Sequence, residues 1–206
     1  MADHTDNGLL AAIKALDEVV APAVDSSNPL AVEQLRLVSR YLQFLRERLQ
    51  YQADSDRYEL WHYTELAKSL LAQMQPLPVQ VQVHAQLHLA TQVEVQVQVP
   101  VQVQAEVQQR LAHAVVAAAP MCEDASVPLE AIRAAIGPLT SAISALVRCI
   151  ATVQPDQRMP IERVVLEASK RLLGVQRAFY LPIGFEPDPK LVPTIDSALA
   201  ARFGRP

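Results

Sequence analysis

The sequence predicts an all-α protein, an irregular bundle of six or seven helices that forms a single domain over residues 1–206. Apolar residues recur three and four positions apart through most of the chain, and prolines fall where these runs begin and end. The sequence lacks the regular alternation of strand and helix patterns that a parallel sheet requires. Half of the 206 residues are hydrophobic and 19% are charged, so the chain can bury a sizeable core.

The N-terminal quarter of the chain predicts two helices. The first is expected over residues 7–20, with Thr5 or Asp6 as its cap and Pro22 just past its end. The second begins with Asn28 as N-cap and Pro29 in the first helical position, the clearest helix start in the sequence. Its expected buried stripe consists of apolar residues at spacings of three and four: Val32, Leu35, Val38, Leu42, Leu45 and Leu49.

A third helix is expected to begin between Asp54 and Asp56, because acidic residues favour a helix N-terminus, and to stop before Pro76. Only a short polar link separates it from the second helix. Since such links usually join neighbouring helices that run in opposite directions, we predict an antiparallel hairpin of the second and third helices.

The pattern changes over residues 79–107, where apolar residues hold the odd positions and glutamine, histidine or glutamate holds almost every even one. A period of two is typical of a half-buried strand, but one strand of this length would span about 70 Å, wider than a compact domain. Three alternatives stay open: a hairpin that turns near residues 90–91, a partly helical segment, and an inserted loop. We favour a low-complexity Val-Gln insertion at 79–104, extended or disordered, because loops tolerate insertions.

The remainder of the chain predicts more helices. They are expected over residues 102–120, residues 128–152, residues 160–179 and, after an irregular proline-rich connection at 181–193, residues 194–203. Ser126 is a possible cap for the second of these. Gly137 and Pro138 fall inside it, so we expect it to kink or split there. Pro160 is expected in the first turn of the next helix.

Charge and composition limit the expected partners and location. The formal net charge is -4 and the pI is about 5.7, so no nucleic acid is expected as a partner. Arginines gather in the second and third helices, at positions 36, 40, 46, 48 and 57, but interleaved acidic residues favour a solvated face with local ion pairs. The N-terminal residues lack the pattern of a secretory signal, and the longest uncharged apolar helical stretch, 134–147, is short for a membrane span. We therefore expect a cytoplasmic protein without a membrane span.

One aromatic cluster stands out in the sequence, in the third predicted helix. Its ligand-pocket candidates are Tyr58, Trp61, His62 and Glu65, with Tyr63 beside them. A histidine next to aromatic rings and a carboxylate could serve as a general base. The competing interpretation is structural: Tyr58 and Trp61, three apart, belong to a buried stripe, whereas His62 and Glu65 face solvent. We favour the structural interpretation and predict no catalytic residue.

Other candidate chemistry is weaker. His84 and His88 are four apart and could share a metal ion, but no nearby cysteine or carboxylate completes the ligand set, and both also fit as replacements of glutamine in the repeat. Cys149 is expected to be buried, and Cys122 lies among acidic neighbours, so neither is predicted to be a nucleophile. The sequence contains no phosphate-loop, zinc-protease or calcium-loop motif. No metal and no cofactor are predicted.

These observations favour a non-enzymatic function. We expect a helical accessory or protein-interaction protein that binds a partner chain, or itself, through an apolar groove between helices. The alternative is a helical bundle that binds an apolar small ligand, or acts as a minor enzyme, near Trp61 and His62. A third hypothesis is that the Val-Gln tract drives self-association through β-pairing.

Overall fold

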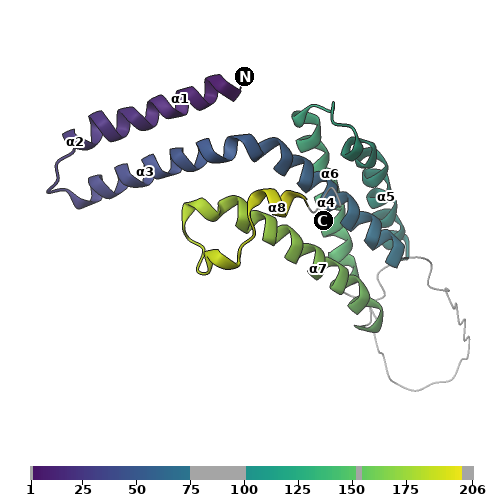
Figure 1. Cartoon of the computed structure of the whole chain (residues 1–206). Helices are drawn as coiled ribbons and strands as arrows, with labels where there is room; N and C mark the ends of the chain where they lie inside the picture. The colour runs from purple at the N-terminus through teal and green to yellow at the C-terminus, as the bar shows by residue number, and fades with distance from the viewer. Residues whose placement is uncertain (1, 75–100, 152–154, 201–206) are drawn as a thin grey trace, which may run out of the picture. The chain divides into compact units, whose positions relative to one another are not determined.

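The computed structural model of the chain describes residues 2–74, 101–151 and 155–200 (Figure 1). The predicted all-α fold class is confirmed, since these residues form helices and turns without a strand. The long helices are α1 (Ala2–Lys14), α3 (Pro29–Arg48), α4 (Gln52–Gln73), α5 (Val101–Glu123), α6 (Leu129–Ile150) and α7 (Pro155–Tyr180). The shorter elements are the π-helix η1 (Ala15–Val20), α2 (Ala21–Ala23), the 3-10 turns η2 (Leu49–Tyr51), η3 (Leu181–Ile183) and η4 (Pro189–Leu191), and α8 (Ile195–Ala200).

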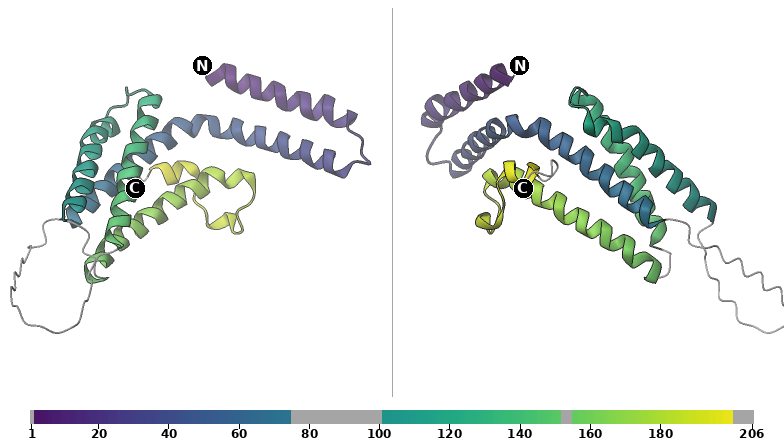
Figure 2. Two further views of the ribbon diagram at one scale, coloured as in Figure 1. Left: turned by 180° about the vertical axis from the view of Figure 1, so that it is seen from behind. Right: turned by 45° about the vertical axis from the view of Figure 1, so that its right-hand side comes forward.

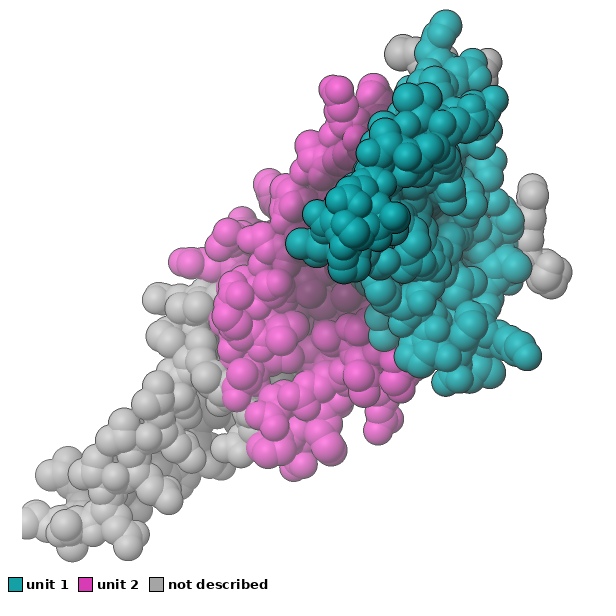
Figure 3. Space-filling model, turned by 90° about the vertical axis from the view of Figure 1, so that its left-hand side faces the viewer, with its two compact units in different colours: residues 1–58, 171–206 teal, residues 59–170 magenta. Residues whose placement is uncertain are grey.

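The described residues fall into two compact units, which Figure 3 colours separately. Unit 1 draws on residues 1–58 and 171–206, and unit 2 on residues 59–170. The boundaries between the two units lie inside α4 and α7. The single domain that the sequence suggests stays a prediction.

Unit 1 contains a helical hairpin of α1 and α3, which lie alongside each other in every view of Figures 1 and 2. Two side-chain pairs show that the helices are antiparallel. Arg46 Nε donates to Asp6 Oδ1 at 2.8 Å, and Ser39 Oγ donates to Asp17 Oδ1 at 2.7 Å. Ser39 is buried, so this second bond lies within the contact between the helices.

The predicted hairpin of the second and third helices is wrong. The turn η2 joins α3 to α4 without reversing the chain, because the residues at both of its ends, Arg48 and Gln52, keep right-handed helical backbone angles. The link is short, but it contains neither glycine nor proline to break the helix. The hairpin partner of α3 is α1 instead.

The first helix also departs from its predicted bounds. It begins at Ala2, so neither Thr5 nor Asp6 caps it, and its helical path passes Pro22 through η1 and α2. In the wider turn of η1 the Ala21 N–H bonds to the Leu16 carbonyl, five residues back. Pro22 then lies in the first turn of α2, where a missing N–H is tolerated.

The start of α3 is confirmed, but its predicted stripe is partly wrong. Asn28 Oδ1 accepts the Ala31 N–H at 3.2 Å, and Pro29 follows the cap. Of the expected stripe, Val32 and Val38 are exposed, whereas the fully buried residues of α3 are Ser39 and Phe44. The reason is that α3 makes two narrow contacts on opposite sides, with α1 and with the end of α7, rather than one broad contact.

Unit 2 holds the larger hydrophobic core, to which α4, α5, α6 and α7 all contribute. Its fully buried large side chains are Leu60, Leu70, Leu111, Ile132, Leu139 and Leu146. The predicted apolar face of α5 is confirmed by the burial of Val107, Leu111 and Ala118, and α5 packs along α6. The start of α6 differs from its prediction, since Pro128 is the cap residue and Ser126 bonds to Asp124 instead.

Three prolines that were expected to stop, break or start helices lie inside them. Pro120 is in α5, Pro138 in an unbroken α6, and Pro160 in α7, which begins at Pro155. All three lie on exposed sides, where the carbonyl that loses its N–H partner can face water. Next to Pro138, the Thr140 hydroxyl donates to the carbonyls of Ile136 and Gly137 at 3.1 and 3.0 Å.

One helix among the described residues, α6, is long and apolar enough to cross a membrane by length and composition alone. A core helix passes the same test, and α6 contributes Ile132, Leu139, Ile143, Leu146 and Ile150 to the core of unit 2. The Val-Gln insertion at 79–104, with His84 and His88, lies outside the described residues up to residue 100. From Val101 the chain is helical, as the resumed spacing near Gln102 predicts.

The C-terminal segment agrees with its prediction. Residues 181–193 form an irregular connection that contains η3 and η4. The last described helix, α8, is capped by Thr194, whose Oγ1 accepts the Ser197 N–H at 3.3 Å. Ile195, Ala198 and Leu199 of α8 are buried, so this short helix docks through one face.

Candidate interaction surface

The helix α3 carries apolar side chains on the side turned away from α1. Leu30, Leu37, Tyr41 and Phe44, which we call the outer stripe, are spaced by seven, four and three residues. At 3.6 residues per turn these four positions fall within about 60° around the helix. Ser39 and Arg46, which bond to Asp17 of η1 and Asp6 of α1, fall on the opposite side of α3.

The C-terminal end of the outer stripe is covered by the end of α7. Phe44 is buried, its ring stacked on Tyr180 with centroids 5.8 Å apart and set edge-on to Phe179 at 6.1 Å. Tyr41 extends the cluster, with its ring centroid 6.0 Å from that of Phe44. This second aromatic cluster contradicts the expectation of a single one. This cluster could not be predicted from the sequence, because its two pairs of rings lie more than a hundred residues apart.

A charged hydrogen bond holds the two helices together beside this cluster. The Arg48 guanidinium on α3 donates from Nε to the Phe179 carbonyl at 2.7 Å. That carbonyl belongs to the last turn of α7, where carbonyls lack helical N–H partners and a cation is favoured. The α7 end is therefore fixed on α3 by both ring packing and a charge-assisted bond.

The N-terminal part of the outer stripe is exposed. The exposed fraction is 69% for Leu30 and 54% for Tyr41, and Leu37 is exposed as well. Glu33 and Arg36 flank this bare part and form a two-pronged ion pair at 2.8 and 2.9 Å. Exposed aliphatic and aromatic side chains in a row, bordered by charged groups, are the composition of a protein-binding surface.

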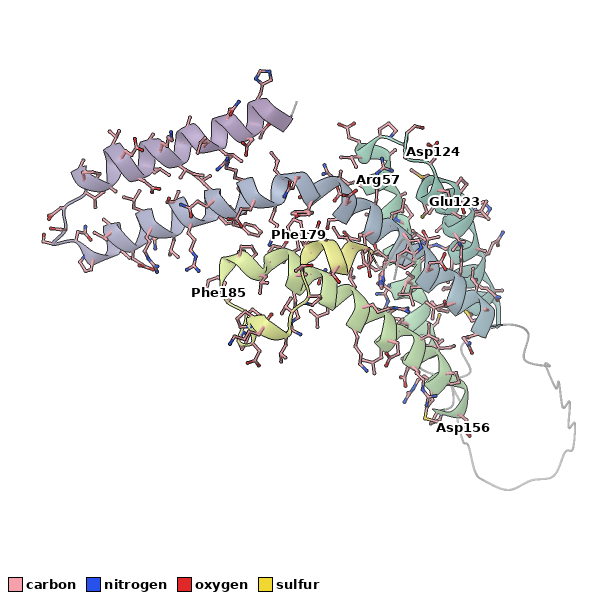
Figure 4. The ribbon with its side chains drawn as sticks, in the orientation of Figure 1. Arg57, Glu123, Asp124, Asp156, Phe179 and Phe185 are labelled. Atoms are coloured by element: carbon pink, nitrogen blue, oxygen red, sulfur yellow. The ribbon has the colours of Figure 1, made fainter. Side chains whose placement is uncertain are left out.

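A second apolar feature of unit 1 lies where α7 meets η3. A hollow of about 390 Å³ is lined by Leu173, Gln176, Arg177, Tyr180, Ile183, Phe185 and Glu186. At its edge Phe185 is 84% exposed, and Figure 4 labels it beyond the end of α7. A phenyl ring this exposed gains nothing from the described fold, which makes it a candidate contact for another molecule.

The loop that presents Phe185 is held by two local features. Gly184 has a φ of 84°, in the left-handed region that glycine adopts readily, and this turns the chain after η3. The Arg177 guanidinium then donates from Nε and Nη2 to the two oxygens of Glu186, at 3.0 and 2.5 Å. These hydrogen bonds lower the pKa of the Glu186 carboxyl below its ordinary value.

The ligand-pocket candidates that the sequence suggested all lie on α4, but they differ in burial and do not share one environment. Tyr58, in unit 1, is buried as expected, and burial raises its pKa. In unit 2, Trp61 is half-buried rather than part of the fully buried core, and Glu65 is half-buried, with an ion pair to Lys68 at 2.8 Å. His62 was expected to face solvent, which is wrong: it is only 3% exposed.

The error at His62 has a physical cause. The part of α4 in unit 2 buries residues on several sides, among them Leu60, Thr64 and Leu66, so it has no single inward stripe. When a helix is packed on several sides, polar side chains become buried that an amphipathic pattern, with one apolar and one polar side, would place in solvent. The His62 ring lies edge-on to Tyr63, with centroids 5.4 Å apart.

Thr64 and Cys122 of unit 2 bond to each other and to the backbone. Thr64 Oγ1 donates to the Leu60 carbonyl one turn earlier at 2.8 Å, and the Cys122 thiol donates to Thr64 Oγ1 at 3.6 Å. Cys149 is half-buried, less than its predicted burial, and both cysteines are free thiols. Among the described residues, no group of three or more His, Cys, Asp or Glu side chains is placed to hold a metal ion.

Unit 2 also has an open groove of about 480 Å³ between α5 and α6. It is lined by Gln109, Arg110, His113, Ala114, Pro138, Ser141 and Ala142. Three of these side chains, from Gln109, Arg110 and His113, lie within one turn of α5 and offer hydrogen-bond donors. None of the ligand-pocket candidates from the sequence lines this groove.

No protein-family model, no curated protein and no solved structure matches the chain.

Proposed function

We propose that this chain is a non-enzymatic helical interaction protein, in which unit 1 presents a binding surface to another polypeptide. The observation that carries the proposal is the bare part of the outer stripe: Leu30, Leu37 and Tyr41 lie exposed on one side of α3. Burying such side chains against a helix of another polypeptide removes apolar area from water, which stabilises the complex by roughly 25 cal/mol per Å² of buried area.

The composition of unit 1 supports the same function. Binding hot spots are rich in aromatic and arginine side chains, and unit 1 exposes Tyr41, Tyr180 and Phe185 together with arginines. The rings of Tyr41 and Tyr180 pack against or near the buried Phe44, which restricts their motion before any partner binds. Side chains that are already ordered lose less entropy on binding.

The experiment is site-specific photo-crosslinking in the cells of origin. A photoreactive phenylalanine analogue is placed at Leu37 or Phe185, and at Val116 as the matched control. Val116 is also an exposed apolar residue, 74% exposed, but it lies on α5 in unit 2. We expect protein adducts from the first two positions and none from the third. Absence of adducts at both unit 1 positions, or equal adducts at Val116, would contradict the proposal.

A second candidate function is the binding of a small molecule in unit 2. The groove between α5 and α6 favours it, because Arg110, His113 and Gln109 can donate hydrogen bonds while Ala114 and Pro138 offer apolar contact. This donor set suits a small organic anion. The sequence suggested a different version of this function, in which an apolar ligand binds near Trp61 and His62 rather than in the α5–α6 groove.

The two forms are distinguished by where a ligand acts. A ligand in the α5–α6 groove should shift the NMR signals of His113, whereas a ligand near Trp61 should change the fluorescence of that tryptophan, the only one in the chain. Arg110→Ala should abolish the first response and leave the second unchanged. A library of organic anions and apolar small molecules that moves neither signal would exclude this candidate function.

A further inference from the structure

We propose that the groove between α5 and α6 binds a small amphipathic monocarboxylate, with the carboxylate against Arg110 and the apolar body between the two helices. The inference rests on the second candidate function, because it names the chemical class of the ligand for the same groove. The volume of the groove, about 480 Å³, lies within the range of small-molecule sites.

Arg110 and His113 are the basic side chains that line the groove. They are three residues apart on α5 and therefore lie on the same side of that helix. Both are exposed, and within the described part of the chain neither forms a hydrogen bond or an ion pair. A guanidinium has five N–H donors and an imidazole has at least one. These donors are therefore free to bind an anion in the groove.

The two helix stretches that form the groove contain basic residues but no acidic ones. Residues 107–122 of α5 and 131–150 of α6 include three arginines and one histidine, without an aspartate or glutamate, although the whole chain has a net charge of -4. Toward the start of α5 the nearest acidic residue, Glu106, lies one turn before Arg110 and does not line the groove. This local excess of positive charge favours an anionic ligand.

The donors in the groove match a carboxylate better than a phosphate. Arg110 is the single arginine or lysine of the lining, and a guanidinium binds the two oxygens of a carboxylate with two parallel hydrogen bonds. Gln109 and His113 can each donate one more bond to the same oxygens. Phosphate sites usually add backbone N–H groups at a helix N-terminus. The groove lies along the middle of α5 and α6, where backbone N–H groups are bonded within the helices.

The remaining lining of the groove is mostly small and apolar. Ala114 on α5 and Pro138 and Ala142 on α6 offer methyl and ring carbon atoms, and Ser141 adds one hydroxyl. An alkyl chain or a ring placed against them loses contact with water, which favours binding. Because Ala114 lies one turn after Arg110, the anionic and apolar parts of the groove follow each other along α5. The ligand is therefore expected to carry its carboxylate at one end of an apolar body.

The first test is titration of the full chain with hexanoate, followed by the backbone amide NMR signals. We expect saturable shifts at residues 109–114 and 138–142. Hexanamide has the same shape without the charge and should bind about tenfold more weakly or worse. Butanoate should bind about fourfold more weakly than hexanoate, since each methylene in an open groove is half-buried. Hexanamide that binds as tightly as hexanoate, or shifts that fall only outside the groove, would overturn the inference.

The second test changes Arg110. Arg110→Ala should weaken hexanoate binding by about tenfold or more, and Arg110→Lys, which keeps the charge without the two parallel donors, should fall between it and wild type. The matched control is Arg148→Ala, because Arg148 is exposed on α6 but does not line the groove. It should bind hexanoate like wild type. Equal weakening by Arg110→Ala and Arg148→Ala would show attraction to overall charge and overturn the inference.

The third test separates this inference from the second candidate function. Phenylacetate and phenyl phosphate share a ring and differ in their anionic group, and we expect phenylacetate to bind the groove more tightly. Phenyl phosphate that shifts the groove signals while neither phenylacetate nor hexanoate does would overturn the inference and leave the second candidate function standing. No shift at the groove with any of the three anions would overturn the inference and count against that candidate function as well.

Discussion

Phe44 and Tyr180 stack face to face, with an angle of 21° between their rings, although 136 positions separate them in the sequence. Together with the Arg48 bond to the Phe179 carbonyl, this stack fixes the last turn of α7 on α3. It also divides the outer stripe into a covered and a bare part. The stability of unit 1 and its proposed binding surface therefore depend on the same side of one helix.

Phe44→Ala should destabilise unit 1 strongly. The side chain is 4% exposed and contacts three other rings, so its removal leaves a cavity, at a cost of about 3 kcal/mol. The measurement is urea unfolding followed by circular dichroism. The matched control is Tyr41→Ala, in the same cluster but 54% exposed, which should cost less than about 1 kcal/mol. Equal losses for the two variants would contradict the assignment of Phe44 as the centre of the cluster.

Ile13→Ala should loosen α1 from α3. Ile13 is the buried hydrophobic residue of α1, and truncating it removes about 2 kcal/mol of packing. Because Ile13 is the buried anchor of this segment, whereas Leu9, Leu10 and Leu16 are only partly buried, amide hydrogen exchange should become faster over residues 4–20 in particular. Unchanged exchange in α1, or equal acceleration throughout unit 2, would show that Ile13 does not anchor the hairpin.

Local rules predicted much of this fold because they act within a few residues. Asn28 and Pro29 mark the start of α3, and the spacing of Val107, Leu111 and Ala118 identifies the buried face of α5, since capping and periodicity need no knowledge of the tertiary structure. The same rules placed helix ends at Pro120 and Pro160, where the helices in fact continue. A proline inside a helix removes one backbone hydrogen bond and crowds the preceding turn, and here the packing of the helices outweighs that cost.

The aromatic cluster at the end of α7 and the burial of His62 could not be predicted, because they depend on which helices pack together. In the sequence, Tyr41 and Phe44 are indistinguishable from other apolar positions of an amphipathic helix. Their role becomes clear only in the structure, where Phe179 and Tyr180 of α7 complete the aromatic cluster. The burial of His62 likewise follows from how many helices surround α4. Both features required the tertiary packing, which explains why the candidate surface lies away from the aromatic cluster that the sequence pointed to.

Leu111→Ala should destabilise unit 2, whereas Val116→Ala on the same helix should not. Leu111 is fully buried in the core formed with α6, and large-to-small changes at such sites cost about 3 kcal/mol. Val116 is 74% exposed, so its truncation should change the free energy of unfolding by less than about 0.5 kcal/mol. Chemical denaturation of both variants measures the difference. A costly Val116→Ala would indicate that this side of α5 is covered in solution.

Gly184→Ala should strain the loop that presents Phe185. The φ of 84° is unfavourable for a residue with a Cβ, at about 1 kcal/mol, and the added methyl group would also collide with the Arg40 guanidinium. That guanidinium is the end of a flexible side chain and can move, so the backbone term should dominate. Thermal unfolding of Gly184→Ala beside Gly137→Ala, where a Cβ meets open space in a helix, tests this. If Gly184→Ala proves the more stable variant, the left-handed turn is not required.

Acidification should release the loop after η3 through Glu186. Hydrogen bonds from Arg177 lower the pKa of this carboxyl in the folded protein, so the pair contributes stability that is complete above the unfolded-state pKa and is lost as the pH falls through the lowered folded-state pKa. Amide exchange at residues 181–191, compared with exchange in α6 at the same pH, measures the release. Glu186→Gln should show the faster exchange already at neutral pH and little further change on acidification below about pH 4. If wild type and Glu186→Gln respond to acid alike, another group controls the loop, and the Arg177 pair does not hold Phe185 in place.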